Sequence, residues 1–160
     1  MRIVTNNDHG REATMQIGGV MRVRLVTAEP DETAATAIRR MLEKEVGSVV
    51  VCEGTVPVGI FTERDVLRLA GAGADFEATV LRDSMTPNPL TISAEDGILE
   101  AAQLMGSRRL RHLPVVEGGN LVGMVSIRDV LAFLAERLWN DHDETAHETA
   151  QALLDRSVKV

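Results

Sequence analysis

Residues 59–70 have the sequence GIFTERDVLRLA, and residues 123–134 have the sequence GMVSIRDVLAFL. Each stretch has a glycine, two apolar residues, a hydroxyl residue, two variable positions and an aspartate, followed by an apolar run. A shift of 64 positions, from 59 to 123, aligns the chain with itself without a gap over roughly fifty residues. A repeat of this length, present twice, indicates a duplicated small domain rather than a solenoid.

The same order of elements is expected in each copy. Apolar residues at helical spacing begin at Ala34 in the first copy and at Ile98 in the second. Two short β-branched runs, separated by a Glu-Gly turn signal, follow each helix and predict a hairpin. An extended piece precedes the helix, and a second amphipathic helix closes the copy. The sequence therefore predicts an α+β fold of two β-α-β-β-α units.

The repeat also predicts how the chain is divided. The expected segments are an N-terminal extension (1–16), a first unit (17–70), a Gly/Ala-rich linker (71–79), a second unit (80–138) and a C-terminal tail (139–160). The tail has apolar residues at helical spacing, so it is expected to be helical. It would pack either on the core or on a partner subunit.

The composition argues against several classes of protein. The net charge is −7 and only 2 % of residues are aromatic, which disfavours nucleic-acid binding. A single cysteine, Cys52, cannot form an internal disulfide. No signal peptide and no apolar stretch of membrane-spanning length is found. These features predict a cytoplasmic protein without a membrane segment.

The repeated motif has an ordinary structural interpretation. Thr62 and Asp65, like Ser126 and Asp129, stand three residues apart just before an apolar run. In this pattern a hydroxyl caps a helix and the acidic side chain bonds back to the start of the helix. Helix capping is therefore expected at both positions.

The motif also has the features of a ribose-phosphate site. Gly59 and Gly123 stand inside β-branched runs, where close approach of a ligand or another backbone is a common reason for glycine. Arg64 and Arg128 precede the aspartates at helix N-termini, which attract anions. A carboxylate at such a place can accept hydrogen bonds from the vicinal hydroxyls of a ribose. Capping and ribose binding are compatible with each other.

The double unit resembles a tandem pair of cystathionine-β-synthase-type (CBS) domains, the regulatory pair called a Bateman module. The resemblance covers about residues 17–138. The motifs that carry it are VMRVRLVTAEPDET, EKEVGSVVV and VGIFTERDVLRL in the first unit, and SMTPNPLTISAEDG, RRLRHLPVVEGGNLVGM and VSIRDVL in the second. Each motif is short, but their order and spacing, present twice, make the resemblance specific.

The resemblance implies a fold, a ligand class and a set of site residues. Two units would pack through their sheets around a pseudo-twofold axis, and two clefts would hold AMP, ADP, ATP, NAD or S-adenosylmethionine. Disc-like homodimers are also implied. The residues implied on the ribose and phosphate side are Thr62, Arg64, Asp65, Ser126, Arg128, Asp129, Arg111 and His112; those on the adenine side are Thr27, Ala28, Thr91, Ile92, Gly59 and Gly123.

The two copies differ on the phosphate side. Where the second unit has Arg111 and His112, the first has Gly47 and Ser48, which carry no charge. Pro57 is also expected to distort the strand edge of the first unit. One cleft should therefore bind a charged nucleotide better, but the sequence leaves open which one. The neighbouring arginines of the second unit either complement the helix C-terminus or contact phosphate.

The function predicted from these features is a non-catalytic regulatory module. It would sense an adenosine-containing nucleotide and signal to an unknown downstream protein through altered packing of the units. The alternative is a dimerisation or scaffold protein whose ligand clefts are empty or vestigial. No catalytic residue, catalytic cofactor or metal site is predicted, because the sequence offers no activated nucleophile, general base or ligand cluster.

Overall fold

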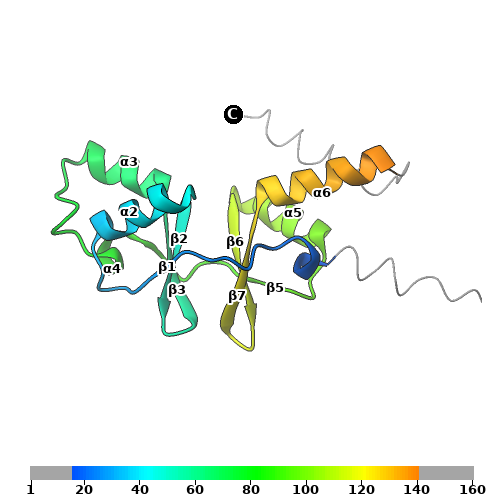
Figure 1. Cartoon of the computed structure of the whole chain (residues 1–160), viewed down its shortest axis with the longest axis horizontal. Coiled ribbons are helices and arrows are strands. Elements are labelled where there is room, and N and C mark those ends of the chain that lie inside the picture. Colours follow the sequence, from blue (N-terminus) through cyan, green and yellow to red (C-terminus); the bar gives the residue numbers. More distant parts are fainter. Residues whose placement is uncertain (1–15, 141–160) are drawn as a thin grey trace, which may run out of the picture.

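The computed structural model of the chain describes residues 16–140 and contains two α+β units (Figure 1). The elements are η1 (Ile17–Gly19), β1 (Thr27–Ala28), α2 (Ala34–Lys44), β2 (Ser48–Glu53), β3 (Val56–Thr62), α3 (Glu63–Gly71), α4 (Leu81–Ser84), β4 (Thr86–Pro87), β5 (Ile92–Ser93), α5 (Ile98–Arg108), β6 (His112–Glu117), β7 (Asn120–Ser126) and α6 (Ile127–Asn140). The predicted order of elements is present in both repeats. The predictions for the first 15 residues and for residues 141–160 lie outside the described residues.

Each unit contains one small mixed sheet. The strand order is β1-β2-β3-β4 in the first sheet and β5-β6-β7 in the second. The first strand of each sheet is parallel to the next, and each hairpin is antiparallel. Both hairpins have a register shift at the same place, after Val51 and after Val115. Leu121 stands in the second hairpin where the first has Pro57, so the proline is not the cause of the irregularity.

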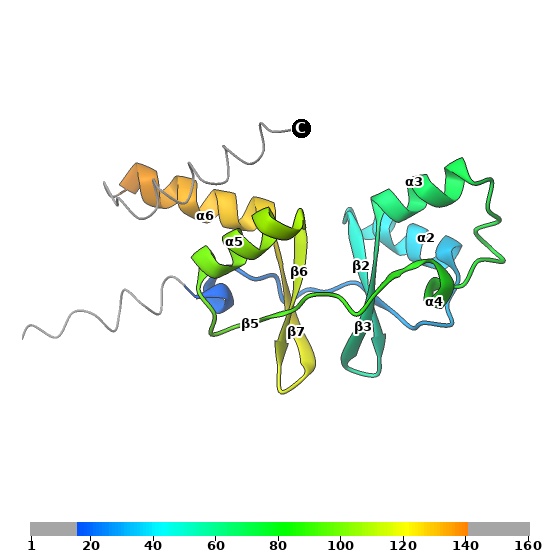
Figure 2. The ribbon, with the colours of Figure 1, turned by 180° about the vertical axis from the view of Figure 1, so that it is seen from behind.

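The first sheet is buried on both faces. Val49 and Val51 of β2 lie in one apolar cluster with Ala37 and Met41 of α2, and Val50 between them is buried as well. Successive strand residues point to opposite faces, so the α2 side cannot cover Val50. Figures 1 and 2 show the two sheets side by side at the centre, with the helices on the outer sides, and β3 contacts β7. The predicted packing of two units through their sheets is confirmed.

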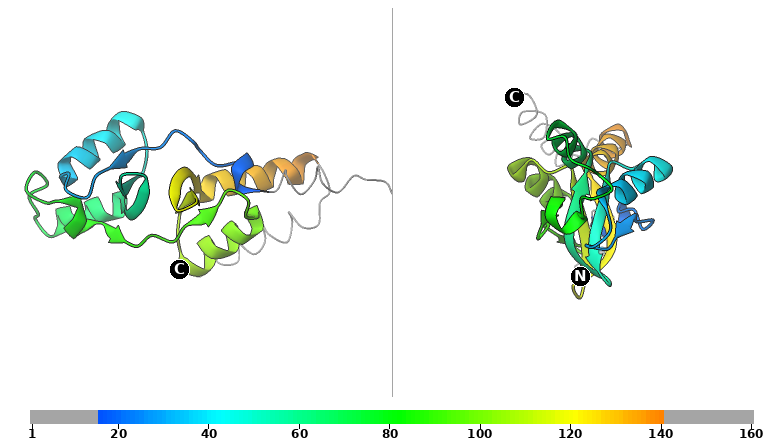
Figure 3. Two further views of the ribbon diagram at one scale, coloured as in Figure 1. Left: turned by 90° about the horizontal axis from the view of Figure 1, so that it is seen from below. Right: turned by 90° about the vertical axis from the view of Figure 1, so that its left-hand side faces the viewer.

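Two short segments cross between the units. Ile17 in η1 is fully buried in the apolar cluster of the second unit, although its sequence belongs to the first repeat. Leu81 in α4, at the equivalent position of the second repeat (17 + 64), is fully buried in the cluster of the first unit. Figure 3 shows the chain passing between the halves along two separate paths, one after η1 and one after α4. Each core is therefore completed by a residue of the other repeat.

The segment predicted as a linker, 71–79, packs on the first unit. Phe76 and Ala74 lie against its apolar cluster. The backbone N–H of Ala35 donates to the carbonyl of Phe76 over 3.0 Å, which joins this segment to the first turn of α2. The boundary between the two units stays a prediction.

The two glycines of the repeated motif make room for methionines of the crossing segments. A Cβ atom at Gly59 would lie 2.0 Å from the sulfur of Met85, and one at Gly123 would lie 2.4 Å from the sulfur of Met21. The methionines are 64 positions apart, like the glycines. The close approach expected at these glycines is therefore made by a side chain of the other repeat. Contact of either glycine with a ligand stays a prediction.

Replacing Gly59 by alanine should lower the free energy of unfolding by about 1–3 kcal/mol, the usual cost of overpacking a core. Met85 has to leave its place because the new Cβ would overlap its sulfur. The double variant Gly59→Ala/Met85→Ala should show favourable coupling in denaturant unfolding. Gly71→Ala is the control, since a Cβ there meets nothing within 4 Å. Additive losses in the double variant would contradict the contact.

Candidate functional site

The first candidate carboxylate, Asp65, is fixed where β3 runs into α3. Thr62 donates to its Oδ2 twice, from the backbone N–H over 2.9 Å and from the hydroxyl over 2.8 Å. The side chain is 12 % exposed. The capping box of Thr62 and Asp65 is complete, which confirms the predicted capping of α3, and Oδ1 lies outside the capping bonds.

The second carboxylate, Asp129, is fixed in the same way where β7 runs into α6. Its Oδ2 accepts from the backbone N–H of Ser126 over 2.9 Å and from the hydroxyl of Ser126. Its own backbone N–H donates back to the Ser126 hydroxyl over 3.3 Å. The structure thus brings the hydroxyl and the aspartate of the motif together in both units.

The arginines beside the two carboxylates are not the ones that directly precede the aspartates in the sequence. Arg68, one turn further along α3, approaches Asp65 Oδ1 at 3.4 Å and donates to the carbonyl of Ser84 over 2.7 Å. Arg22, on the segment that crosses from the first repeat, donates to Asp129 Oδ1 from Nε over 3.0 Å and from Nη2 over 2.9 Å. The spacing of Arg68 from Asp65 could have indicated the first contact. Nothing in the sequence pattern indicated the second.

The arginines that directly precede the aspartates, Arg64 and Arg128, are exposed. Within residues 16–140 neither forms an ion pair with an aspartate of the motif. Their guanidinium groups therefore remain at the surface next to the N-termini of α3 and α6. A role for them toward phosphate stays a prediction.

The pKa of Asp129 lies below the ordinary value for an aspartate. Burial is the largest single influence and acts to raise the pKa, but the hydrogen bonds from Ser126 and the guanidinium of Arg22 together outweigh it. An ionised carboxylate only accepts hydrogen bonds. Asp129 is thus kept in the form that a pair of ribose hydroxyls would require.

His112, predicted on the phosphate side, is partly buried at the start of β6. Burial is the main cause that lowers the pKa of its imidazole, and Arg111 and Arg128 act in the same direction against Asp129 and Glu63. The imidazole is therefore mainly neutral at pH 7. Arg111 itself is exposed.

The His112→Gln variant should lose part of the pH dependence of folding stability. The folded-state pKa of His112 is below the unfolded value of about 6.5, so the unfolded chain takes up the proton more readily. The free energy of unfolding of the wild type should therefore fall as the pH drops below about 6.5. Denaturant unfolding of both proteins between about pH 7.5 and 5 measures the difference. Equal slopes would contradict the prediction.

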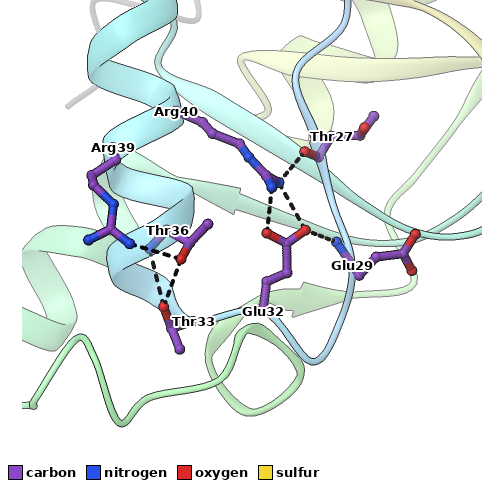
Figure 4. Close-up of polar contacts among 7 residues, drawn as sticks. All are labelled: Thr27, Glu29, Glu32, Thr33, Thr36, Arg39 and Arg40. Atoms are coloured by element: carbon purple, nitrogen blue, oxygen red, sulfur yellow. Dashed lines mark hydrogen bonds and ion pairs between the residues drawn. The ribbon is translucent and has the colours of Figure 1, made fainter.

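Of the residues predicted on the adenine side, Thr27 and Ala28 lie in β1 at the edge of the first sheet, two strands away from β3 and the motif. β1 pairs with β2, which pairs with β3. The carbonyl of Thr27 accepts from Arg40 over 2.8 Å, and Arg40 also donates to Glu32 Oε1 over 2.9 Å (Figure 4). Glu32 accepts in turn from the backbone N–H of Glu29. The side chain of Ala28 is buried in the core. A ligand would meet this edge through the backbone.

The equivalent edge of the second unit keeps the backbone-to-carboxylate bond but lacks the arginine. The N–H of Ser93 donates to Asp96 Oδ2 over 2.7 Å, as that of Glu29 does to Glu32. Position 104, equivalent to Arg40 (40 + 64), is Leu104, which packs against the second apolar cluster. Thr91 is exposed and Ile92 is buried. The placement of an adenine along either edge stays a prediction.

Two repeats of this topology, each with a carboxylate fixed at the N-terminus of its last helix, define a tandem pair of capped β-α-β-β-α domains. The family model described as the CBS domain matches the chain twice, over residues 17–71 and 80–136. The chain therefore belongs to the CBS-domain family.

Relatives and solved structures agree with this assignment. The chain is 35 % identical over 121 residues to the uncharacterized protein MK0525 of Methanopyrus kandleri, covering 74 % of this chain and 62 % of the relative. It is 38 % identical over 107 residues to the mitochondrial CBS domain-containing protein CBSX3 of Arabidopsis thaliana, covering 63 % of this chain and 52 % of the relative. It therefore spans less than two thirds of either relative.

A solved structure of the family contains a nucleotide. The CBS domain protein PAE2072 from Pyrobaculum aerophilum, in complex with AMP, superimposes with a TM-score of 0.71 and 26 % identity, over 78 % of this chain and 99 % of that protein.

None of the helices in the described part of this chain has the length and apolar character needed to cross a membrane.

Proposed function

We propose that this chain is a non-catalytic regulatory module that binds an adenosine-containing nucleotide. One observation carries the proposal. In each unit a largely buried, ionisable carboxylate is held by a capping hydroxyl at a helix N-terminus, and its second oxygen points away from the cap. Such an oxygen can accept hydrogen bonds from vicinal hydroxyls, while exposed N–H groups and arginines nearby favour phosphate. The AMP in PAE2072 supports the same ligand class.

The residues would take different parts in binding. Asp65 and Asp129 accept the ribose hydroxyls, and Thr62 and Ser126 hold them in place. The residues proposed around the phosphate are Arg64, Arg111, His112 and Arg128, and those proposed along the adenine are Thr27, Ala28, Thr91, Ile92, Gly59 and Gly123. The ligand is AMP, ADP, ATP, NAD or S-adenosylmethionine, and no catalytic cofactor takes part.

The signal would be carried by the relative packing of the units. The sheets contact each other through β3 and β7, and the turn of the first hairpin bonds the second, since Leu121 N–H donates to the Thr55 carbonyl over 2.8 Å. A ligand shifts such packing only by as much as it binds one arrangement better than another. A downstream protein or a second copy of the chain would respond to the change.

A dimerisation or scaffold role is the second candidate. Three leucines on outer helices are exposed: Leu42 and Leu67 each at 74 %, and Leu131 at 41 %. Apolar residues at such positions are suited to contact with another subunit. In this role assembly alone would be the function, and a cytoplasmic homodimer would form with or without a nucleotide.

Calorimetric titration with AMP, ADP, ATP, NAD and S-adenosylmethionine tests the proposal. At least one of the five should bind, and its 2′,3′-dideoxy analogue should bind at least about tenfold more weakly, because the carboxylates lose their hydroxyl donors. Equal binding of the dideoxy analogue would contradict the role of the carboxylates. Absence of binding by all five compounds would favour the scaffold role.

A further inference from the structure

The two candidate carboxylates differ in how many acceptor positions remain open. An ionised carboxylate has about four acceptor positions, two on each oxygen. In Asp129 all of them are used, two by the N–H and hydroxyl of Ser126 and two by Nε and Nη2 of Arg22. In Asp65 the described residues supply two bonds from Thr62 and one long contact of 3.4 Å from Arg68. Vicinal hydroxyls therefore find unused acceptor positions on Asp65 Oδ1 but must displace an arginine from Asp129.

The placement of Arg22 follows from the exchange of segments between the repeats. Its N–H donates to the carbonyl of Met124 over 2.8 Å, and its carbonyl accepts from the N–H of Met124 over 3.0 Å, so its backbone is fixed beside β7. The position 64 residues later is Thr86, which pairs with Ile60 of β3 in the same way. Threonine has no long cationic side chain, so the first unit has no equivalent of the Arg22 contact.

The two arginines also differ in what holds them. Arg68 is anchored by its bond to the Ser84 carbonyl and stays beside Asp65 whatever occupies the remaining positions. Among the described residues, the guanidinium of Arg22 bonds only to Asp129, and its side chain is 64 % exposed. Arg22 can therefore turn into solvent, or toward a bound group, without breaking another contact with those residues.

We propose that Arg22 is a displaceable latch: its guanidinium occupies Asp129 until a ligand replaces it, and only phosphorylated ligands do so efficiently. The Asp65 site has no such latch and stays open to neutral ligands. This inference rests on the proposed function. A ribose that takes over Asp129 Oδ1 releases a guanidinium from its carboxylate partner. A phosphate on the same ligand replaces that partner, because arginine binds phosphate as well as carboxylate through paired hydrogen bonds. Neutral adenosine carries no anionic group and provides no such replacement.

The test uses the full chain with Asp65→Asn, so that only the Asp129 site is measured, and compares AMP with adenosine by calorimetric titration. Adding Arg22→Gln should increase adenosine affinity about tenfold, since no charge-assisted contact has to be broken. The same change should reduce the preference for AMP over adenosine. Arg24→Gln is the matched control: Arg24 is exposed on the same segment and makes no hydrogen bond or ion pair within residues 16–140. It should leave adenosine affinity unchanged.

The possible failures are distinguishable. If AMP binds but Arg22→Gln leaves adenosine affinity unchanged or lowers it, the latch is wrong while nucleotide binding stands. If no adenosine compound binds even the wild-type chain, the proposed function and the latch both fail. A ligand-free readout tests the contact itself: Arg22→Gln should raise the pKa of Asp129 in a carboxyl NMR titration, and an unchanged pKa would overturn the latch.

Discussion

Replacing Ile17 by alanine should destabilise the second unit, although Ile17 belongs to the first repeat. Ile17 is fully buried among residues of α5, β6 and α6. Truncating a buried isoleucine to alanine costs about 2–5 kcal/mol, because the lost contacts leave a cavity. The equivalent Leu81→Ala change should have a similar cost and should destabilise the first unit. Denaturant unfolding gives the size of each loss.

Native-state hydrogen exchange shows where each loss occurs. Ile17→Ala should reduce the protection of amides in α5 and α6 most, and Leu81→Ala that of amides in α2 and α3. Val23→Ala is the control on the same crossing segment, since Val23 is 70 % exposed, and it should change stability by no more than about 0.5 kcal/mol. Loss of protection in α2 and α3 after Ile17→Ala would show that each repeat completes its own core instead.

The elements of the fold were predictable because their signals are local. The helical spacing from Ala34 and from Ile98 marks the first residue of α2 and of α5. The turn at Gly54, where φ is +63°, separates β2 from β3 as the Glu-Gly signal indicated. These features depend on neighbours within a few positions, so a single sequence contains them.

The crossing of Ile17 and Leu81 into the core of the other unit was not predictable, because it depends on which unit each segment meets in space. Ile17 and Leu81 would fill a core equally well in either unit, and the sequence pattern of the repeat is the same in both cases. The glycines of the motif indicated a close approach, but they did not indicate that Met21 and Met85 make it.

Only the local contacts of the candidate site were predictable, again because long-range contacts depend on how the units meet in space. The hydroxyl and aspartate of the motif lie within one helical turn, so their contact follows from local spacing. Arg22 is separated from Asp129 by more than a hundred residues, and its contact depends on the crossing segment. The difference between the units expected at Arg111 and His112 is therefore accompanied by a second difference at the carboxylates themselves.

The double variant Asp65→Asn/Asp129→Asn should lose nucleotide binding at both sites. An asparagine keeps one oxygen for the capping N–H, but its amide nitrogen donates where the ribose hydroxyls need an acceptor. Each single change should weaken the site that contains it by about 10- to 100-fold, since hydrogen bonds to charged groups contribute about 1.5–3 kcal/mol. Titration of the four proteins with the tightest of the adenosine compounds measures this.

The stability of the same variants separates the capping role from the binding role. Asp65→Asn removes only a long contact to Arg68, whereas Asp129→Asn removes the two charge-assisted bonds from Arg22. Asp129→Asn should therefore cost more stability, while Asp65→Asn, whose site is open, should cost more affinity for a neutral nucleoside. If both variants lose stability but keep wild-type affinity, the two aspartates serve only as helix caps. The ligand would then have to be held by other residues, because no arrangement of the ribose on Asp65 or Asp129 leaves affinity independent of the carboxylate.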